Sequence, residues 1–160
     1  MTQRQRRAPA RPLTAGQRAR QLANLANGTT LLGLALARAA GTAVSNGPRG
    51  LVIAGGYRWR LPYAGAFTVG NVVLSRGPAA LLTSNTALLG HEEKHSSQYA
   101  CCLGLPFLPL YFLAAAWSQL RTGNPASANF FERLAGLEAG GYVDTRTPRP
   151  APRGAGGIEV

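Results

Sequence analysis

The sequence contains few of the residues that usually bind metal ions or transfer protons. Its 160 residues include 2 histidines, 2 cysteines and 6 acidic residues, and no Asp or Glu precedes His91. The cysteines are adjacent, at Cys101 and Cys102, and neighbouring cysteines rarely form a disulfide because the bond strains the peptide between them. We expect them to be small core residues, with soft metal ligation as the alternative. Any metal or acid–base site must therefore be built from very few side chains.

Acidic charge is scarce relative to basic charge. The chain has 17 Lys and Arg against 6 Asp and Glu, a formal net charge of +11, and Lys94 is the one cation that is not arginine. Such an excess attracts anionic membranes or nucleic acids. A composition rich in arginine, alanine and glycine also accompanies a GC-rich genome, and the sequence contains no nucleic-acid-binding motif. We therefore retain an anionic membrane surface as a partner and do not expect nucleic acid.

Both ends of the chain lack a pattern of apolar residues. Residues 1–27 are basic and proline-bearing, and residues 144–160 are mostly Arg, Pro and Gly, so both are expected to be disordered tails. The 28–143 region between them has the length of a single domain. No apolar stretch follows the first arginines closely enough for a signal peptide. We expect a protein of the cytoplasm, or one at or within the cytoplasmic membrane.

The spacing of apolar residues changes along the domain. Residues 29–44 are largely apolar and predict a helix. Residues 51–54 form a short apolar run, residues 57–63 alternate aromatic or apolar with Arg or Pro, and residues 67–75 are rich in strand-forming types. These segments predict a small antiparallel sheet. The expected fold class is α+β, with this sheet packed on a helical core.

Two helices are predicted in the second half of the domain. The first covers residues 85–101, with Ser84 or Thr83 as its N-cap. The stretch that follows, up to Leu120, carries no charge and has about the 20 residues that can span a bilayer. Prolines near its start interrupt a helix. We therefore expect a helix over residues 109–120, buried either in protein or in the membrane.

Both histidines of the chain lie at metal-ligand spacing on the first of these helices. His91 and His95 are four positions apart, so a helix places them on one face, about one turn apart. Glu92 completes the His-Glu-x-x-His pattern, in which two imidazoles bind zinc and the carboxylate accepts a proton from the water at the metal. Gln98 follows His91 by about two helical turns and could line the same face. The pattern predicts a zinc site with Glu92 as general base.

A third ligand must come from elsewhere in the chain. A catalytic zinc is usually held by three protein groups, and no third histidine exists. The remaining candidates are a cysteine or a carboxylate, and among the carboxylates Glu132 and Glu138 are the serious ones. We favour Glu132 because it opens a predicted helix from about Asn129 to Glu138 and leaves Leu134 and Ala135 to pack.

These motifs resemble those of a known group of enzymes. His91-Glu92-x-x-His95 followed by Glu132-x-x-Ala135 is similar to the gluzincin metallopeptidases, in particular the small membrane-linked prenyl-protein and heat-shock endopeptidases. The peptidases usually carry an aspartate after that alanine, where this chain has Gly136. The chain resembles still more closely a set of short actinobacterial proteins, over roughly residues 50–142. Their shared pieces are His-Glu-x-x-His-x-x-Gln-Tyr, here His91 to Tyr99, then Pro-x-x-Pro-x-Tyr, here Pro106 to Tyr111, and Asn-x-Phe-Glu, here Asn129 to Glu132.

The resemblance implies a zincin-like core and a zinc-dependent peptidase acting on a peptide or protein substrate. It also makes residues 72–75 a candidate for the sheet edge along which an extended substrate pairs, with an ordinary packed strand as the alternative. Tyr99, Tyr142 or an arginine is the candidate for stabilising the oxyanion. Further residues are expected to support the ligands: Gln98, Tyr99, Asn129 and Glu138.

Two other interpretations remain open at this stage. The histidines and Glu132 could form a charged cluster without metal. The chain could also be a non-catalytic metal-binding or membrane-associated scaffold, docked on anionic lipid through its Arg-rich tail and apolar helices. The sequence predicts no oligomeric state.

Overall fold

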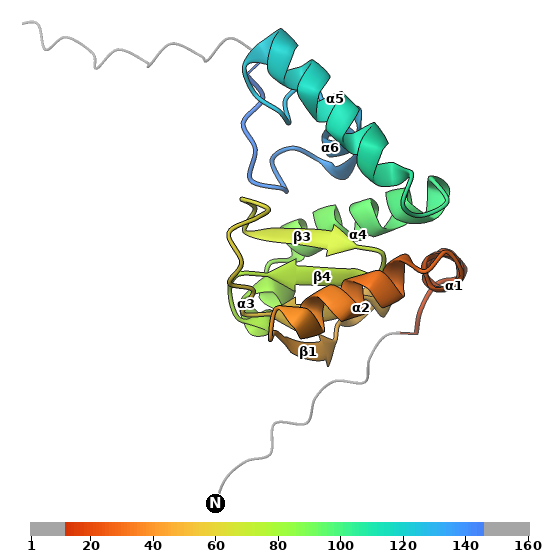
Figure 1. Ribbon diagram of the computed structural model, residues 1–160. Helices are drawn as coiled ribbons and strands as arrows, with labels where there is room; N and C mark the ends of the chain where they lie inside the picture. Colours follow the sequence, from red (N-terminus) through yellow and green to blue (C-terminus); the bar gives the residue numbers. More distant parts are fainter. Residues whose placement is uncertain (1–11, 146–160) are drawn as a thin grey trace, which may run out of the picture.

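A computed structural model describes residues 12–145 as six α-helices and a four-stranded sheet (Figure 1). The predicted α+β class is confirmed. The elements, in chain order, are α1 (Ala15–Ala26), α2 (Thr29–Ala39), β1 (Ala43–Asn46), the 3-10 turn η1 (Pro48–Gly50), β2 (Val52–Gly55), β3 (Ala66–Val69), β4 (Val72–Ser75), α3 (Ala79–Ser84), α4 (Thr86–Cys101), α5 (Phe107–Thr122) and α6 (Phe130–Ala135).

The sheet is mixed, and the prediction of an antiparallel sheet is wrong. Its strand order is β1-β2-β4-β3, and β4 runs parallel to β2 but antiparallel to β3. The chain leaves β2, crosses to the far edge as β3, and returns through a tight turn at Gly70 into the space between them. Gly70 has a φ of 61°, which glycine adopts without strain. This path makes β3 the edge strand beside the C-terminal half of the chain (Figure 1).

Residues 72–75 form an ordinary packed strand, the alternative that the sequence left open, and not the sheet edge. All four residues of β4 are buried, as is typical of an interior strand that reads as a continuous apolar run. The edge position belongs to β3, Ala66–Val69, which pairs with β4 in the register Thr68↔Val73.

The alternating stretch 57–63 does not form a strand. Residues 56–65 are an irregular loop, and Pro62 cannot donate to a strand ladder. Arg76 holds this loop by donating hydrogen bonds to the carbonyl oxygens of Ala64, Arg60 and Pro62, at 2.9, 3.0 and 2.7 Å. The alternating residues 57–63 therefore belong to a loop that is held by the Arg76 side chain. Trp59 of this loop is 47% exposed.

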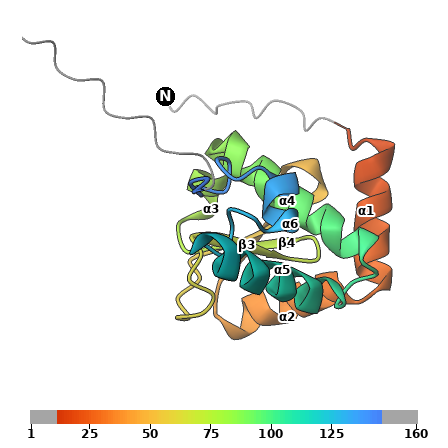
Figure 2. The same ribbon diagram turned by 90° about the horizontal axis from the view of Figure 1, so that it is seen from above.

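Helices cover both faces of the sheet (Figure 2). Ala54, Val72 and Leu74 face α2 and pack with its Ala37. Alternate residues of the same strands, such as Ile53 and Val73, face the other way and pack with Leu82 of α3 and Leu89 of α4. This second layer fixes α4, the predicted metal helix, against the sheet.

Two predictions for the first third of the chain need correction. Residues 15–26, expected to belong to a disordered tail, form α1. This helix is attached through polar contacts, since buried Arg20 pairs with Glu93 at 2.7 Å and buried Asn24 donates to the Ser96 carbonyl at 2.8 Å. An apolar pattern could not reveal such contacts. The predicted helix over residues 29–44 ends at Ala39, and its last part contributes to β1.

The last two helices follow the predicted positions with shifted ends. α5 begins two residues before the expected start, but it is largely exposed rather than buried in protein, because only Phe107 and Ser118 are fully buried. Among residues 12–145, no helix is long and apolar enough to cross a membrane. α6 ends at Ala135, where Gly136 takes a φ of 95°, so it does not continue to Glu138. Residues 1–11 and 146–160, where the outer parts of the predicted tails fall, lie outside the described residues.

Candidate metal site

The helix that carries the histidines forms as predicted, over Thr86–Cys101. Its N-cap is Asn85, whose side chain accepts a hydrogen bond from the Leu88 amide, rather than the predicted Ser84 or Thr83. His91 and His95 are 3% and 8% exposed. Both rings face away from the solvent-exposed side of α4, toward α6, which α4 contacts closely.

Glu132 lies on α6 against both imidazole rings. Its Oε2 is 3.3 Å from His91 Nε2, its Oε1 is 3.6 Å from His95 Nε2, and the two Nε2 atoms are 3.0 Å apart. One ligand atom from each of the three residues lies within 4.8 Å of the others, and all three residues are buried. The residues predicted as ligands are thus brought together, and the group could hold a metal ion.

The outer ring nitrogens set the protonation of both histidines. His91 Nδ1 is 3.0 Å from the Gly136 carbonyl oxygen, which can only accept, so this nitrogen carries the proton. His95 Nδ1 is 2.8 Å from Gln98 Oε1. The Nε2 of the same Gln98 side chain donates a hydrogen bond of 2.9 Å to the Phe131 carbonyl oxygen. Each neutral ring therefore presents an unprotonated Nε2 to the centre, as histidine ligands of metals do.

The centre of the group is under-satisfied without a cation. Two Nε2 lone pairs that face each other at 3.0 Å need either an added proton or a positive ion between them. Glu132 Oε2 is buried and has no hydrogen-bond partner within residues 12–145. Buried polar atoms are nearly always partnered. The donor set could therefore hold a metal ion.

Tyr111 supports Glu132 from α5. Its hydroxyl donates a hydrogen bond to Glu132 Oε1, which leaves Oε2 facing His91. Sequence reasoning did not assign it a role, although it closes the Pro-x-x-Pro-x-Tyr piece of the resemblance. Asn129 caps the helix that carries Glu132. Its side chain accepts a hydrogen bond of 3.0 Å from the Phe131 amide at the start of α6.

Glu92 lies between α4 and the edge strand. Thr68 on β3 donates a hydrogen bond of 2.6 Å to Glu92 Oε2. Burial raises the pKa of Glu92 above its ordinary value, and the Thr68 hydrogen bond and the nearby histidines only partly offset this. Thr68 could not be found from the sequence, because its role depends on which strand forms the edge.

The negative charge of Glu132 and a positive charge on His95 stabilise each other. Burial opposes ionisation of Glu132, but the neighbouring His91 and His95 rings lower its pKa to about 2. Burial also disfavours a charged His95, but Glu132 outweighs it and raises the pKa of the imidazole. In the absence of a metal, the chain can therefore hold a proton where a cation would otherwise sit.

The segment after α6 covers His91. A Cβ atom placed on Gly140 would lie 2.4 Å from His91 Cε1, so only glycine fits there. The Tyr142 ring lies 6.2 Å from the His91 ring, and burial raises the pKa of Tyr142 to about 12. Of the candidate oxyanion residues, Tyr142 therefore has its ring beside a ligand ring.

Three other predicted positions play different parts. Tyr99 packs its ring on Phe107 at 4.5 Å, within the apolar contact between α4 and α5. Glu138 is exposed beyond the end of α6 and is not part of the ligand group. Cys101 is exposed and Cys102 half-buried, so the expectation of two core cysteines is wrong.

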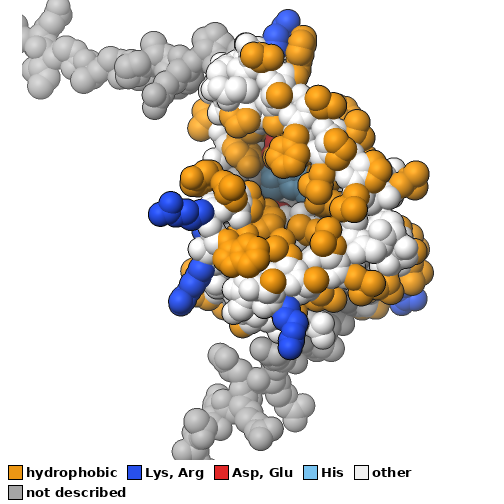
Figure 3. Space-filling view, in the orientation of Figure 1, with side chains coloured by type: hydrophobic (Ala, Val, Ile, Leu, Met, Phe, Trp, Pro, Cys, Tyr) orange, Lys and Arg blue, Asp and Glu red, His pale blue; other side chains and the backbone are white. Residues whose placement is uncertain are grey.

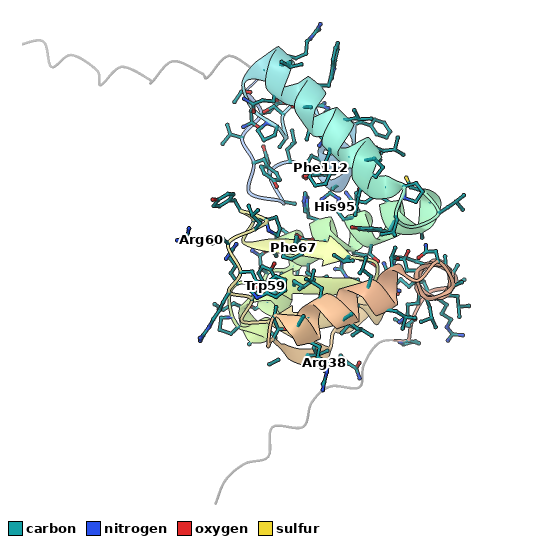
Figure 4. The ribbon with its side chains drawn as sticks, in the orientation of Figure 1. Arg38, Trp59, Arg60, Phe67, His95 and Phe112 are labelled. Atoms are coloured by element: carbon teal, nitrogen blue, oxygen red, sulfur yellow. The ribbon has the colours of Figure 1, made fainter. Side chains whose placement is uncertain are left out.

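The ligand group is visible from one side of the molecule. Histidine and acidic atoms can be seen at the base of a hollow surrounded by hydrophobic side chains (Figure 3). Phe112 lies above His95 and Phe67 below it, on the two sides of this hollow (Figure 4). A substrate approaching the ligands would therefore pass between α5 and β3.

Comparisons of the chain with protein-family models, with curated proteins and with solved structures gave no match. The assignment of a function to the site therefore depends on its geometry and on the chemistry of its side chains.

Proposed function

We propose that the protein is a zinc-dependent metallopeptidase with a zincin-like core. The observation that carries the proposal is the buried meeting of the His91 and His95 Nε2 atoms with Glu132 Oε2, which has no hydrogen-bond partner among the described residues, next to the buried carboxylate of Glu92. Imidazole nitrogen and carboxylate oxygen are zinc ligands, and two histidines with one glutamate form a known catalytic set. A bound zinc ion would lower the pKa of a water molecule and polarise a peptide carbonyl.

Glu92 supplies the proton transfers. Its Oε2 accepts from Thr68, which leaves Oε1 to take a proton from the attacking water and pass it to the leaving nitrogen. A raised pKa brings the carboxylate closer to the pH at which a general base is most effective. Thr68 is a positioning residue that fixes the side-chain rotation of Glu92.

The edge strand β3 is the proposed position of the substrate backbone. Within residues 12–145, β3 pairs on one side only, with β4. An extended peptide can add to such an edge through main-chain hydrogen bonds. Thr68 belongs to this strand and contacts Glu92, so a peptide paired there would lie beside the general base.

Hydrolysis of a broad library of unstructured peptides by the zinc-loaded chain tests the proposal. We expect cleavage by the natural chain, and a loss of about 10²- to 10⁴-fold in turnover for Glu92→Gln with its zinc content unchanged. His95→Ala should lose both zinc and turnover. Cleavage by Glu92→Gln at the natural rate would refute the base assignment. Absence of cleavage by the zinc-loaded natural chain would leave a non-catalytic metal-binding scaffold.

A further inference from the structure

α5 is an apolar helix that the other residues of the described range, 12–145, leave largely uncovered. Arg121 is its one charged residue, and only Phe107 and Ser118 are fully buried. Contiguous exposed apolar surface of this kind marks a site of interaction. Its exposed large side chains are Leu110 at 47%, Phe112 at 64%, Leu113 at 68%, Trp117 at 57% and Leu120 at 85%.

A second apolar element lies across the hollow from α5. The loop over residues 56–65 exposes Trp59 at 47%, Leu61 at 65% and Tyr63 at 88%. Trp59 and Phe112 lie on the same side of the molecule, with His95 between them (Figure 4). We call the exposed apolar side chains of α5 and of this loop the apolar face. Hydrophobic side chains surround the opening above the ligand group (Figure 3).

Basic side chains border the apolar face. Arg38 and Arg60 project from the margin on this side (Figure 4), and the guanidinium of Arg121 lies over the Trp117 ring at 5.1 Å. Among the described residues visible in Figure 3, acidic atoms occur only inside the hollow. The surface therefore combines an apolar centre with a cationic margin.

We propose that the apolar face docks on the surface of an anionic lipid bilayer. Leucine and aromatic side chains would enter the boundary of the acyl chains, tryptophans would lie at headgroup depth, and the arginines would reach the lipid phosphates. A second copy of the chain fits less well, because a two-fold contact through the same surface would bring its cationic margins together. Docking would place the opening of the ligand group at the bilayer surface.

The docking restricts the substrate if the proposed peptidase function holds. A peptide reaching β3 would then come from the plane of the bilayer surface. The substrate class would be polypeptide segments that lie on a membrane or emerge from it. This consequence depends on the proposed function, whereas the docking itself does not.

Intrinsic fluorescence with lipid vesicles tests the docking on the full chain. The 2 tryptophans of the protein, Trp59 and Trp117, both belong to the apolar face. We expect a blue shift of their emission, and flotation of the protein, with phosphatidylcholine vesicles that contain phosphatidylglycerol. Pure phosphatidylcholine vesicles should give at least about fivefold weaker binding, and high salt should weaken binding to the anionic vesicles. Equal binding to both vesicle types, or to neither, would overturn the proposal.

Substitutions on α5 locate the contact. Phe112→Ser with Leu113→Ser should reduce vesicle binding at least tenfold. Leu81→Ser is the matched control, because Leu81 is 65% exposed on α3, on the opposite side of the sheet (Figure 2). Arg121→Gln should weaken binding while Arg121→Lys retains it. An equal loss in the Leu81 control, or a dimer in light scattering that the α5 pair dissociates, would contradict lipid docking.

A further variant separates this proposal from the peptidase function. Glu92→Gln should bind anionic vesicles as the natural chain does, since Glu92 is 3% exposed and is not one of the exposed side chains of the apolar face. For the natural chain, vesicle binding without hydrolysis would reject only the peptidase. Hydrolysis without vesicle binding would reject only the docking.

Discussion

Tyr111 donates a hydrogen bond to Glu132 Oε1, while Glu132 Oε2 has no hydrogen-bond partner and faces the imidazole of His91. One oxygen of the carboxylate is thus occupied by a neutral donor and the other is left for a cation. We expect Tyr111→Phe to weaken zinc binding by about 10- to 100-fold, the usual effect of removing a hydrogen bond to a metal ligand. Competition with a chromophoric chelator measures the affinity.

Tyr99→Phe is the control for that variant. Tyr99 is a buried tyrosine of α4 whose ring packs on Phe107 and is not bonded to Glu132. Its zinc affinity should stay within about threefold of the natural value, a small effect relative to that expected at Tyr111. Equal affinities in both variants would show that Tyr111 does not position the carboxylate.

Gln98 is expected to fix the orientation of His95. It accepts from His95 Nδ1 and donates to the Phe131 carbonyl, so it links the imidazole to the start of α6. Gln98→Leu should reduce zinc affinity by about 10- to 100-fold. Ser97→Ala, which removes only a hydrogen bond to the Glu93 carbonyl, should leave the affinity unchanged. The assignment fails if isothermal titration finds the same affinity for both variants.

Gly140 is expected to tolerate no side chain. The Cβ atom of an alanine would lie 2.4 Å from His91 Cε1 and 2.7 Å from His91 Nε2, so the ring or the segment above it must move. We expect Gly140→Ala to lower the free energy of unfolding by about 1–3 kcal/mol, as overpacking does, and to weaken zinc binding. Gly65→Ala is the control, since nothing lies within 4 Å of the added atom. A zinc affinity in Gly140→Ala equal to that of the natural chain would show that the segment over His91 can move aside without disturbing the site.

The metal-free protein should show a pH-dependent contribution from the Glu132 and His95 pair. The pKa of Glu132 is lowered from 4.5 to about 2, so its contribution is present above pH 4.5 and disappears as the pH falls toward 2. The pKa of His95 is raised above 6.5, so its contribution is present below pH 6.5 and disappears as the pH rises through the raised value. Both should therefore be present between pH 4.5 and 6.5.

The difference between the natural chain and Glu132→Gln isolates this contribution. Thermal unfolding with a chelator should show the largest difference in Tm between pH 4.5 and 6.5, with smaller differences on either side. The depression of the Glu132 pKa from 4.5 to about 2 corresponds to about 3 kcal/mol at most. A difference in Tm that does not vary with pH would contradict the assigned charge pair.

The ligand residues could be predicted because helix geometry is local and because the chain has few histidines and carboxylates. A helix fixes the spacing of His91 and His95, and the chain offers few carboxylates for a third ligand. Thr68 and Tyr111 could not be predicted, because their roles depend on which strand forms the sheet edge and on how α5 meets α6. No local pattern encodes those arrangements.

The fold shows the same division between local and long-range information. α4 appears within one residue of its predicted start, because its cap and apolar spacing are local. The parallel pairing of β2 with β4 depends on the path of the 56–65 loop, which is held by the side chain of Arg76. The apolar pattern of the sequence does not predict α1, because this helix is attached to the domain through the polar side chains of Arg20 and Asn24.

Zinc titration of the chelator-treated protein tests the central claim most directly, with Glu132→Ala and Glu138→Ala beside the natural chain. Glu138 is the other carboxylate that the sequence offered, and it is exposed outside the ligand group. We predict one zinc ion per natural chain, the same affinity in Glu138→Ala, and an affinity at least about 100-fold lower in Glu132→Ala. Equal affinities in all three proteins, or no zinc bound by the natural chain, would contradict a metal site formed by His91, His95 and Glu132.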